Sequence, residues 1–233
     1  MEKSDIPLRV MSPGPAPLVI FLGGAGVRMH ERRPPRHLAP FVSHIWHLTA
    51  DRETTLRVLP DGCTDLIGDD LVGSLTGAIV AELRAGESTY GVRFRPGGFT
   101  ALYGVPAGEL ADIRLPLADV IRRPRSLDEA ARDADPPDPL SAVALHVGDI
   151  RALAREYGYS ERQFHRRVLA ATGHGPKRLS RIGRMQALLA AGRGESWAAT
   201  AAAFGFHDEA HMINDVRRLA DSTPEAMLSA ATR

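Results

Sequence analysis

The chain carries the same pattern of helix, tight turn and helix twice in its C-terminal part, at residues 149–173 and 196–220. In the first copy, apolar residues recur at helical spacing up to Gly158, a residue type that accepts the left-handed backbone of a helix end. Ser160 then opens the second helix, and Gln163 follows three residues later at the spacing of a capping box. This duplication predicts an all-α unit built from two similar hairpins.

The second copy repeats the first at matching positions. Its turn falls at Gly205, and Met212 and Val216 form the same i, i+4 apolar pair as Phe164 and Val168. The glycine of the turn precedes a proline by 18 residues in the first copy and by 19 in the second. Each proline is expected in the first turn of a helix, where its missing N–H costs nothing. Residues 177–191 are predicted to form a connecting helix between the copies.

The second helix of the first copy combines an apolar back with a polar front of the kind that fits a DNA groove. Arginine can reach a guanine edge with two hydrogen bonds, glutamine can reach adenine, and further arginines can bind phosphates. A solvated basic face on an ordinary helical hairpin is the alternative for a single copy. The occurrence of two copies favours DNA binding.

Two helix-turn-helix units joined by one helix resemble the DNA-binding domain of the AraC/XylS family of bacterial transcription regulators. The resemblance covers residues 147 to about 232 and is most specific in the second unit, at Ala201, Gly205, Phe206, Asp208, Arg217, Thr223 and Pro224. His207 replaces the usual serine or threonine cap, so Asp208 is expected to cap the helix instead. Asp221 replaces the usual glycine, and Met212 and Val216 replace aromatic residues.

The resemblance implies two recognition helices, 161–172 and 208–220, on one side of a rigid body and about 34 Å apart, so that they enter successive major grooves. Base contacts are expected from Arg162, Gln163, Arg166, Glu209, His211 and Asn214, and phosphate contacts from Arg167, Lys177, Arg217 and Arg218. Ser160 and His207, at the helix starts, complete the expected DNA-binding set. Asp208 and Glu209 suit the helix dipole but repel phosphate, so the first unit is expected to contribute more affinity.

Charge is distributed unevenly along the chain, whose overall net charge is +1. Residues 145–233 hold 13 Lys and Arg against 9 Asp and Glu, a net charge of +4, whereas residues 1–144 hold 16 against 19, a net charge of −3. The basic excess therefore lies in the part expected to meet DNA. Because it is small, the prediction depends on where the arginines project.

The composition indicates a cytoplasmic protein without a membrane segment. A single cysteine, Cys63, excludes an internal disulfide framework. The apolar run 18–26 is too short to span a membrane, and acids stand beside the bases of residues 1–10, unlike a signal peptide. Residues 1–27, rich in proline, are interpreted as a flexible N-terminal extension with room for one added strand, and their glycines as a turn rather than a phosphate loop.

Residues 28–121 read as a β-rich domain, which makes the predicted fold class α+β. Short strands separated by turn signals suggest a small antiparallel barrel or sandwich; they are expected at 41–49, 55–59, 63–67, 71–77 and 89–95. A helical turn is expected at 99–103 and a helix at 110–121. The phrases at 33–46, 59–67 and 91–98 resemble an N-terminal domain of some AraC-type regulators. That resemblance implies a sensory or regulatory role through a small-molecule effector, a regulatory partner or dimerisation, with a homodimer left open.

No residue constellation in this domain predicts catalysis, a metal or a cofactor, so an enzyme is not expected. His44 and His47 are three residues apart on a strand and point to opposite faces, which makes them poor joint metal ligands. Cys63 is interpreted as a buried small hydrophobe, and Asp61 and Asp65 as turn or cap residues. Two readings of Arg93 and Arg95 stay open: they bind an anionic ligand, or they pair with Asp65 or Glu109, which is favoured.

Residues 122–140 are interpreted as a linker between the β-rich domain and the AraC-type domain at 141–233, because they are charged and rich in proline. Ser126 and Glu129 have capping-box spacing, which suggests a short helix at 126–132. The alternative function is a small-molecule-binding protein whose helical domain mediates protein contacts. Salt distinguishes the two, since DNA binding through phosphates weakens steeply as salt rises.

Overall fold

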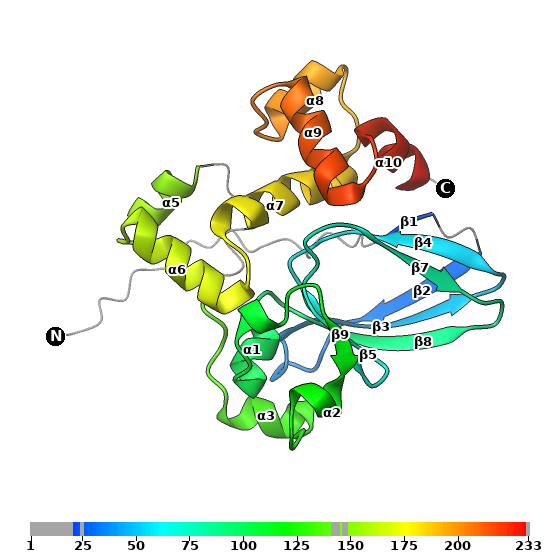
Figure 1. Cartoon of the computed structure of the whole chain (residues 1–233), viewed down its shortest axis with the longest axis vertical. Coiled ribbons are helices and arrows are strands. Elements are labelled where there is room, and N and C mark those ends of the chain that lie inside the picture. The colour runs from blue at the N-terminus through cyan, green and yellow to red at the C-terminus, as the bar shows by residue number, and fades with distance from the viewer. Residues whose placement is uncertain (1–20, 24–25, 141–144, 146–148, 232–233) are drawn as a thin grey trace.

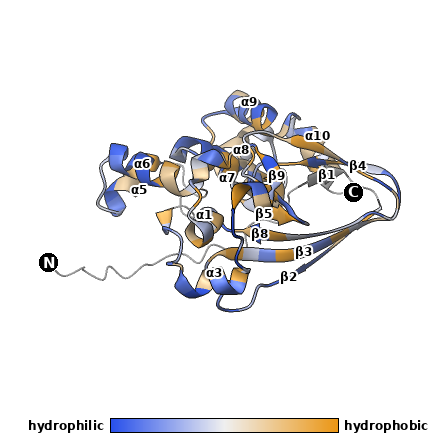
Figure 2. Ribbon diagram, turned by 60° about the horizontal axis from the view of Figure 1, so that its bottom comes forward, coloured by the Kyte–Doolittle hydropathy of each residue, from blue (hydrophilic) through white to orange (hydrophobic). Residues whose placement is uncertain are grey.

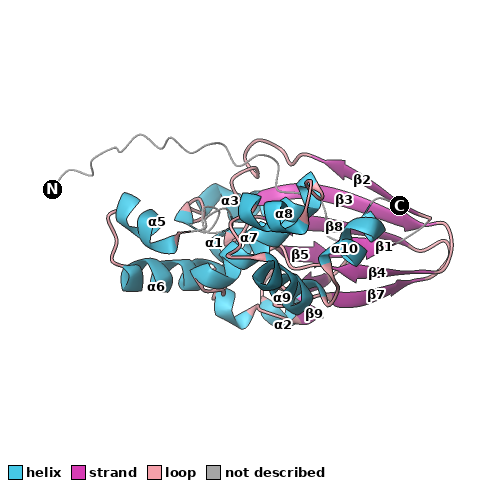
Figure 3. Ribbon diagram, turned by 90° about the horizontal axis from the view of Figure 1, so that it is seen from above, coloured by secondary structure: helices cyan, strands magenta, loops and turns pink. Residues whose placement is uncertain are grey.

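The computed structural model describes residues 21–23, 26–140, 145 and 149–231. Strands and short helices make up the N-terminal domain, here residues 26–134 together with the strand at 21–23. The six helices α5 to α10 make up the helical domain, residues 149–231. Seen from above, α5 and α6 lie at one end of the molecule, while α8 and α10 lie over the strands towards the other end (Figure 3).

The strands form two antiparallel sheets, one with the order β1-β4-β7 and one with the order β2-β3-β8-β5-β6-β9. Among the described residues no strand of one sheet pairs with a strand of the other, so the arrangement is a sandwich rather than a closed barrel. The strands are β1 Phe21–Gly23, β2 Val27–Arg32, β3 Val42–Ala50, β4 Thr54–Val58, β5 Thr64–Ile67, β6 Asp70–Val72, β7 Ile79–Leu83, β8 Ser88–Phe94 and β9 Arg114–Pro116.

Every strand predicted between residues 41 and 95 is present, although β6 is shorter than predicted. The added strand considered for the N-terminal extension is β1, which pairs with β4. Strands β2 and β7 are not predicted by the sequence pattern, because their burial is partial and charged residues interrupt their apolar pattern. The helix predicted at 110–121 is wrong: the segment forms β9, paired with β6, and the short helix α2 Leu117–Val120. Pro116 explains the error, since proline breaks a helix interior and disfavours helical backbone in the preceding residue.

Short helices cover one end of the sheets. They are α1 Gly98–Tyr103, the 3-10 turn η1 Ala107–Glu109, α2, and α3 Leu127–Asp133. Helix α3 begins with the capping box predicted from Ser126 and Glu129. Its Ala130 is fully buried in the core that contains Phe99 and Leu102. This part of the segment expected to be a linker therefore packs on the N-terminal domain.

The helical domain has the predicted order of elements (Figure 1). Its helices are α5 Ile150–Glu156, α6 Glu161–Thr172, α7 Pro176–Ala191, α8 Trp197–Ala203, α9 Glu209–Ala220 and α10 Pro224–Ala231. Gly158 and Gly205 separate the helices of each unit with φ values of 70° and 72°, which confirms the two glycine turns. No helix in the described residues is both long and apolar enough to cross a membrane.

Helix α7 provides a buried surface to both helix-turn-helix units. Leu179 shares one apolar core with Phe164 and Val168 of α6. Further along α7, Ile182 and Met185 share a second core with residues of α9. In Figure 1, α5 and α6 lie at one end of α7 and α8 and α9 at the other. The buried side of the connecting helix thus joins the two units into one body.

Candidate nucleic-acid interface and adjoining pocket

The first recognition helix, α6, turns its polar residues outward. Phe164 and Val168 are fully buried, whereas Arg162 and Arg166 are exposed. Ser160 accepts a hydrogen bond from the backbone N–H of Gln163, and its own backbone N–H donates to the Gln163 side chain at 3.0 Å. The predicted capping box is present. A contact from the Gln163 amide oxygen to a base would compete with this cap for the same oxygen.

Arg167 is held by groups within the protein. Its guanidinium donates to Asp138 at 2.7 Å and to the hydroxyl of Tyr159, and it also stacks over the Tyr159 ring. The side chain therefore ties α6 to the segment before the helical domain. A phosphate contact from Arg167 would share the guanidinium with the Asp138 carboxylate.

The second recognition helix, α9, begins at Asp208 as expected from the departure at His207. The Asp208 carboxylate accepts a hydrogen bond from the His211 backbone N–H at 2.7 Å. His211 is engaged on both ring nitrogens: Nδ1 accepts from the His207 backbone N–H, and Nε2 lies 3.3 Å from Asp215. A neutral ring protonated on Nε2 fits both contacts. Glu209 is half-buried, and Asn214 is exposed.

Asp215 anchors α9 to α7. Its carboxylate is 6 % exposed and pairs with Arg181 at 2.7 Å and with Arg184 at 3.3 Å. The Arg184 guanidinium also stacks over the Phe206 ring, 5.1 Å from its centroid. These two arginines serve the internal packing of the second unit, and the outward cations of α9 are Arg217 and Arg218 in its last turn.

Five of the expected DNA-binding cations are exposed and form no ion pair among the described residues: Arg162, Arg166, Lys177, Arg217 and Arg218. Hydrophilic stretches run along α5, α6 and α9 in Figure 2. His165, which points outward from α6, is a further exposed polar side chain of this surface. Cations free of internal partners are what phosphate contacts require.

The C-terminal end of each recognition helix contacts the N-terminal domain. After α6, His174 is 3 % exposed and hydrogen-bonds the backbone of Ser74. Gly173 approaches η1 so closely that a Cβ would lie 2.4 Å from the Ala107 carbonyl oxygen. After α9, Arg57 of β4 pairs with Asp221 at 2.9 Å. The outward start of each recognition helix is thus far along the helix from the docked end.

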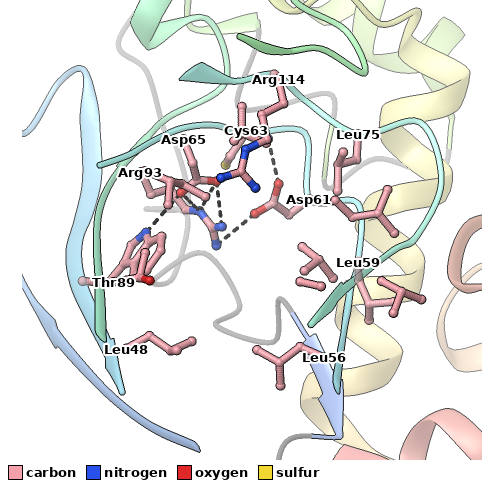
Figure 4. A pocket seen from close by; sticks show the side chains of 18 of the residues that line it. Leu48, Leu56, Leu59, Asp61, Cys63, Asp65, Leu75, Thr89, Arg93 and Arg114 are labelled. Atoms are coloured by element: carbon pink, nitrogen blue, oxygen red, sulfur yellow. Dashed lines mark hydrogen bonds and ion pairs between the residues drawn. The ribbon is translucent and has the colours of Figure 1, made fainter. Parts of the chain in front are cut away.

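A pocket of about 480 Å³ lies between the two sheets of the N-terminal domain (Figure 4). Met29, Trp46 and Leu48 line it from one sheet and Leu56 and Ile79 from the other. The volume is within the usual range for small-molecule sites, and such sites are mostly apolar with a few placed polar groups.

The polar groups of the pocket are Arg93, Asp61 and Asp65. Arg93 donates to both oxygens of Asp65, at 3.1 and 2.8 Å, and lies 3.0 Å from Asp61. Asp65 also accepts from the Trp46 indole N–H at 3.2 Å. Burial raises the pKa of Asp61 despite the opposing effect of Arg93. The favoured pairing of Arg93 with Asp65 is confirmed, and Asp61 is also a turn residue that accepts from the Cys63 backbone N–H.

Two segments of the N-terminal domain touch both the pocket and the helical domain, and we call them the shared wall: residues 59–62 and 75–80. Leu59 lines the pocket and belongs to the apolar core of α7 and α9. The Pro60 carbonyl accepts from the Gln186 side chain of α7 at 2.8 Å. Asp61 lines the pocket, and the adjacent Gly62 lies against Leu145 and Leu179.

The second segment of the shared wall has the same double role. Leu75, Ile79 and Val80 line the pocket. Between them, the Thr76 carbonyl accepts from Arg178 at 3.1 Å, and the Ala78 N–H donates to the Leu219 carbonyl at 2.7 Å. The sequence pattern does not single out the wall residues as a contact with the helical domain. Nothing in a linear pattern relates residues 59 and 78 to residues 186 and 219.

The remaining candidate residues of the N-terminal domain, His44, His47 and Cys63, do not form a common site. His44 bonds the Ser43 hydroxyl at 2.7 Å, and His47 bonds the Ser88 hydroxyl at 2.6 Å. Cys63 is buried, and burial raises the pKa of its thiol, so it behaves as the predicted small hydrophobe. Within the described part of the chain, no three His, Cys, Asp or Glu side chains are grouped to hold a metal.

Family models match both halves of the chain. Residues 30–116 match the family model of a domain of unknown function, DUF6597, and residues 153–230 match a helix-turn-helix domain. No curated protein matches the chain in sequence. Among solved structures, ToxT from Vibrio cholerae is similar at 9 % identity and a TM-score of 0.41, over 90 % of this chain and 100 % of that one. An apo form of a ToxT variant from strain SCE256 is similar at 9 % identity and a TM-score of 0.37, over 90 % and 99 %.

The two matched domains stand in the order expected from the sequence, and both carry the motifs quoted for them. The helix-turn-helix match spans both units and the connecting helix α7. A helix-turn-helix domain of AraC type thus follows a domain of unknown function along the chain. Together the two matches support a DNA-binding regulator of AraC type.

Proposed function

We propose that this regulator binds specific DNA sequences by inserting α6 and α9 into successive major grooves, and that its N-terminal domain modulates this binding. The observation that carries the proposal is the orientation of the two recognition helices. Each buries its apolar residues against the common helix α7 and leaves its arginines exposed. A pair of outward helices fixed on one body is what docking into two grooves requires.

Base reading is assigned first to Arg162 and Arg166 of α6. Both are exposed in the first half of the helix, and neither forms an ion pair among the described residues. Arginine recognises guanine through two parallel hydrogen bonds, which discriminates bases by about 1–3 kcal/mol. In α9, Asn214 is the exposed polar candidate, with Arg217 and Arg218 placed for phosphates. His211 is engaged by the protein on both ring nitrogens, and Glu209 is half-buried.

Modulation is assigned to the shared wall. A ligand in the pocket would contact Leu59 and Asp61, whose neighbour Pro60 is hydrogen-bonded to α7. It would also contact Ile79, next to the Ala78 N–H that donates to the end of α9. A ligand that prefers one arrangement of these segments shifts the population of the attached helices.

The test is footprinting and gel-shift titration of the purified chain on DNA from upstream of its own gene. We expect a protected site whose affinity falls steeply with salt; four phosphate contacts would give a slope of log K against log salt of about −4. Arg162→Ala and Arg166→Ala should each weaken binding, whereas Arg36→Ala, at an exposed arginine of the N-terminal domain, should not. Unchanged affinity in both α6 variants would contradict the assignment of the reading residues.

The same titration tests the second candidate, a small-molecule-binding protein whose helical domain contacts another protein. The pocket and the internally engaged Arg167, Arg181 and Arg184 favour that alternative over a purely electrostatic DNA binder. An apolar protein interface would show little salt dependence and no footprint on DNA.

A further inference from the structure

The pocket between the sheets has a strongly polarised lining. Apolar side chains of both sheets surround most of it, and its buried carboxylates, Asp61 and Asp65, lie against Arg93. A molecule that fills it needs an apolar body and one polar head directed at this end (Figure 4). The charge at the polar end then decides which head groups are accepted.

The polar end contains more negative than positive charge. Arg93, Asp61 and Asp65 are 8 %, 15 % and 11 % exposed, so one guanidinium faces two carboxylates away from bulk water. Glu31 of β2 is a further half-buried carboxylate close enough to feel the Arg93 charge. The pKa of both Asp61 and Glu31 is raised by burial, which reflects the cost of keeping these carboxylates ionised without a further cation.

The rest of the lining adds acids rather than bases. Glu82, Glu87 and Asp112 line the pocket, and the second lining guanidinium, Arg114, pairs with Asp70 at 2.9 Å. Each arginine of the described lining is therefore matched by a carboxylate. An anionic head group would enter next to uncompensated negative charge, whereas a cation would balance it.

We propose that the pocket binds an amphiphilic amine, with its apolar body between the sheets and its ammonium group against Asp61. This inference rests on the regulatory role proposed for the pocket and names the class of its effector. The ammonium donates to Asp61 Oδ1, which also accepts from the Cys63 backbone N–H while Arg93 pairs with Oδ2, and it supplies the missing positive charge. Because Asp61 belongs to the shared wall, the head group meets the segment that is bonded to α7 through Pro60.

The test compares three probes with the same chain and different heads: 1-aminodecane, decan-1-ol and decanoate. Each is titrated calorimetrically into the full-length chain below its micelle concentration. We expect the amine to bind at least about tenfold more tightly than the alcohol, and decanoate to bind most weakly. Equal affinity for amine and alcohol, or tighter binding of decanoate, overturns the proposal.

Variants locate the head group. Asp61→Asn keeps the size of the side chain and removes its charge, and it should reduce the amine's advantage over the alcohol to about threefold or less. Glu53→Gln, at an exposed residue outside the lining, should leave it unchanged. Near-ultraviolet circular dichroism reports whether the Asp61→Asn variant is folded, and if it is not, the comparison of probes on the unmodified chain still decides.

Gel shifts with the same probes separate this inference from the proposed function. If the unmodified chain binds DNA but shows no preference for the amine over the alcohol, the assignment of the amine is wrong and the proposed function is unaffected. Amine binding with no footprint on any upstream DNA would support the ligand class and sink the proposed reading of DNA. A changed footprint affinity on adding 1-aminodecane, absent with Asp61→Asn, supports both.

Discussion

The two helix-turn-helix units share a backbone but differ in how their recognition helices are held. In the first unit, the main charged tether of α6 is the partly exposed contact of Arg167 with Asp138, outside the hairpin itself. In the second unit, α9 is tied to α7 by the buried Asp215 and two arginines. The first unit therefore keeps Arg162 and Arg166 outward, while the second uses its inner arginines for packing.

The two recognition helices also differ in the charges of their first turns. Helix α6 begins with a Ser160 cap, and Glu161 in its first turn pairs with Arg151, whereas α9 begins with two acids, Asp208 and Glu209, and has its outward arginines only in the last turn. Negative charge stabilises a helix start but repels phosphate. We therefore propose that the first unit supplies most of the DNA affinity and that the second, held by buried contacts, supplies less.

The largest effect is expected from breaking the tether of the second unit. Asp215→Ala leaves Arg181 and Arg184 without their buried partner and should lower the free energy of unfolding by about 3 kcal/mol. Asp138→Ala, the matched change at the partly exposed tether of the first unit, should cost less than about 1 kcal/mol. Urea unfolding followed by circular dichroism measures both. Equal losses would mean that the two units are held alike.

Next in size is the effect on DNA affinity. The double substitution Arg162→Ala and Arg166→Ala should weaken binding about 100-fold and relax base preference, since it removes two base contacts. The matched pair in α9, Arg217→Ala and Arg218→Ala, should weaken binding about 10-fold, evenly across sequences, and flatten the salt dependence. Gel-shift titrations at two salt concentrations measure both. Larger losses from the α9 pair would reverse the proposed division of labour.

A smaller effect is expected from the caps. Ser160→Ala removes the side chain that accepts from Gln163 N–H and should cost about 1 kcal/mol. In the second unit, Asp208→Ala should lower the melting temperature, while Asp208→Asn, which keeps an acceptor oxygen, should be milder. Hydrogen exchange of the first-turn amides localises each loss to its own helix. Fraying of α6 in an Asp208 variant would contradict the independence of the two starts.

How far the sequence predicts the molecule differs between its halves. The helical half follows from local patterns, because glycine turns, caps and apolar periodicity are all encoded within a few neighbouring residues. The same local logic correctly predicts β3, β4, β5, β6 and β8 and the cap at Ser126, but it misses β2 and β7. It fails at 110–121, where pairing of β9 with β6 and the restriction imposed by Pro116 override a helical periodicity.

The pocket and the shared wall lie beyond local patterns. Pairing of Arg93 with Asp65 is predictable because alternation places both on expected strands, but the pocket around them depends on how two sheets face each other. The contacts of Pro60 with Gln186 and of Ala78 with Leu219 join residues more than a hundred positions apart. Likewise the outward cations of the recognition helices are predictable, whereas the internal engagement of Arg167 and His211 depends on the packed structure.

The docked ends of the two recognition helices give the smallest and most specific contrast, because only one of them contains a buried histidine. Burial lowers the pKa of His174, Arg178 lowers it further, and Asp112 opposes them. The unfolded chain, with an ordinary histidine pKa of about 6.5, then takes up more protons than the folded chain as the pH falls. The stability that neutral His174 contributes is complete above about pH 6.5 and is lost as the pH drops towards the lower pKa of the folded chain.

Urea midpoints from about pH 7.5 to about pH 5.5 should therefore fall less in His174→Gln than in the unmodified chain. As a control, Asp221→Asn breaks the ion pair with Arg57 at the end of α9 and should leave the pH dependence of the urea midpoint unchanged. If the unmodified chain, His174→Gln and Asp221→Asn all show the same pH dependence, His174 is not its source.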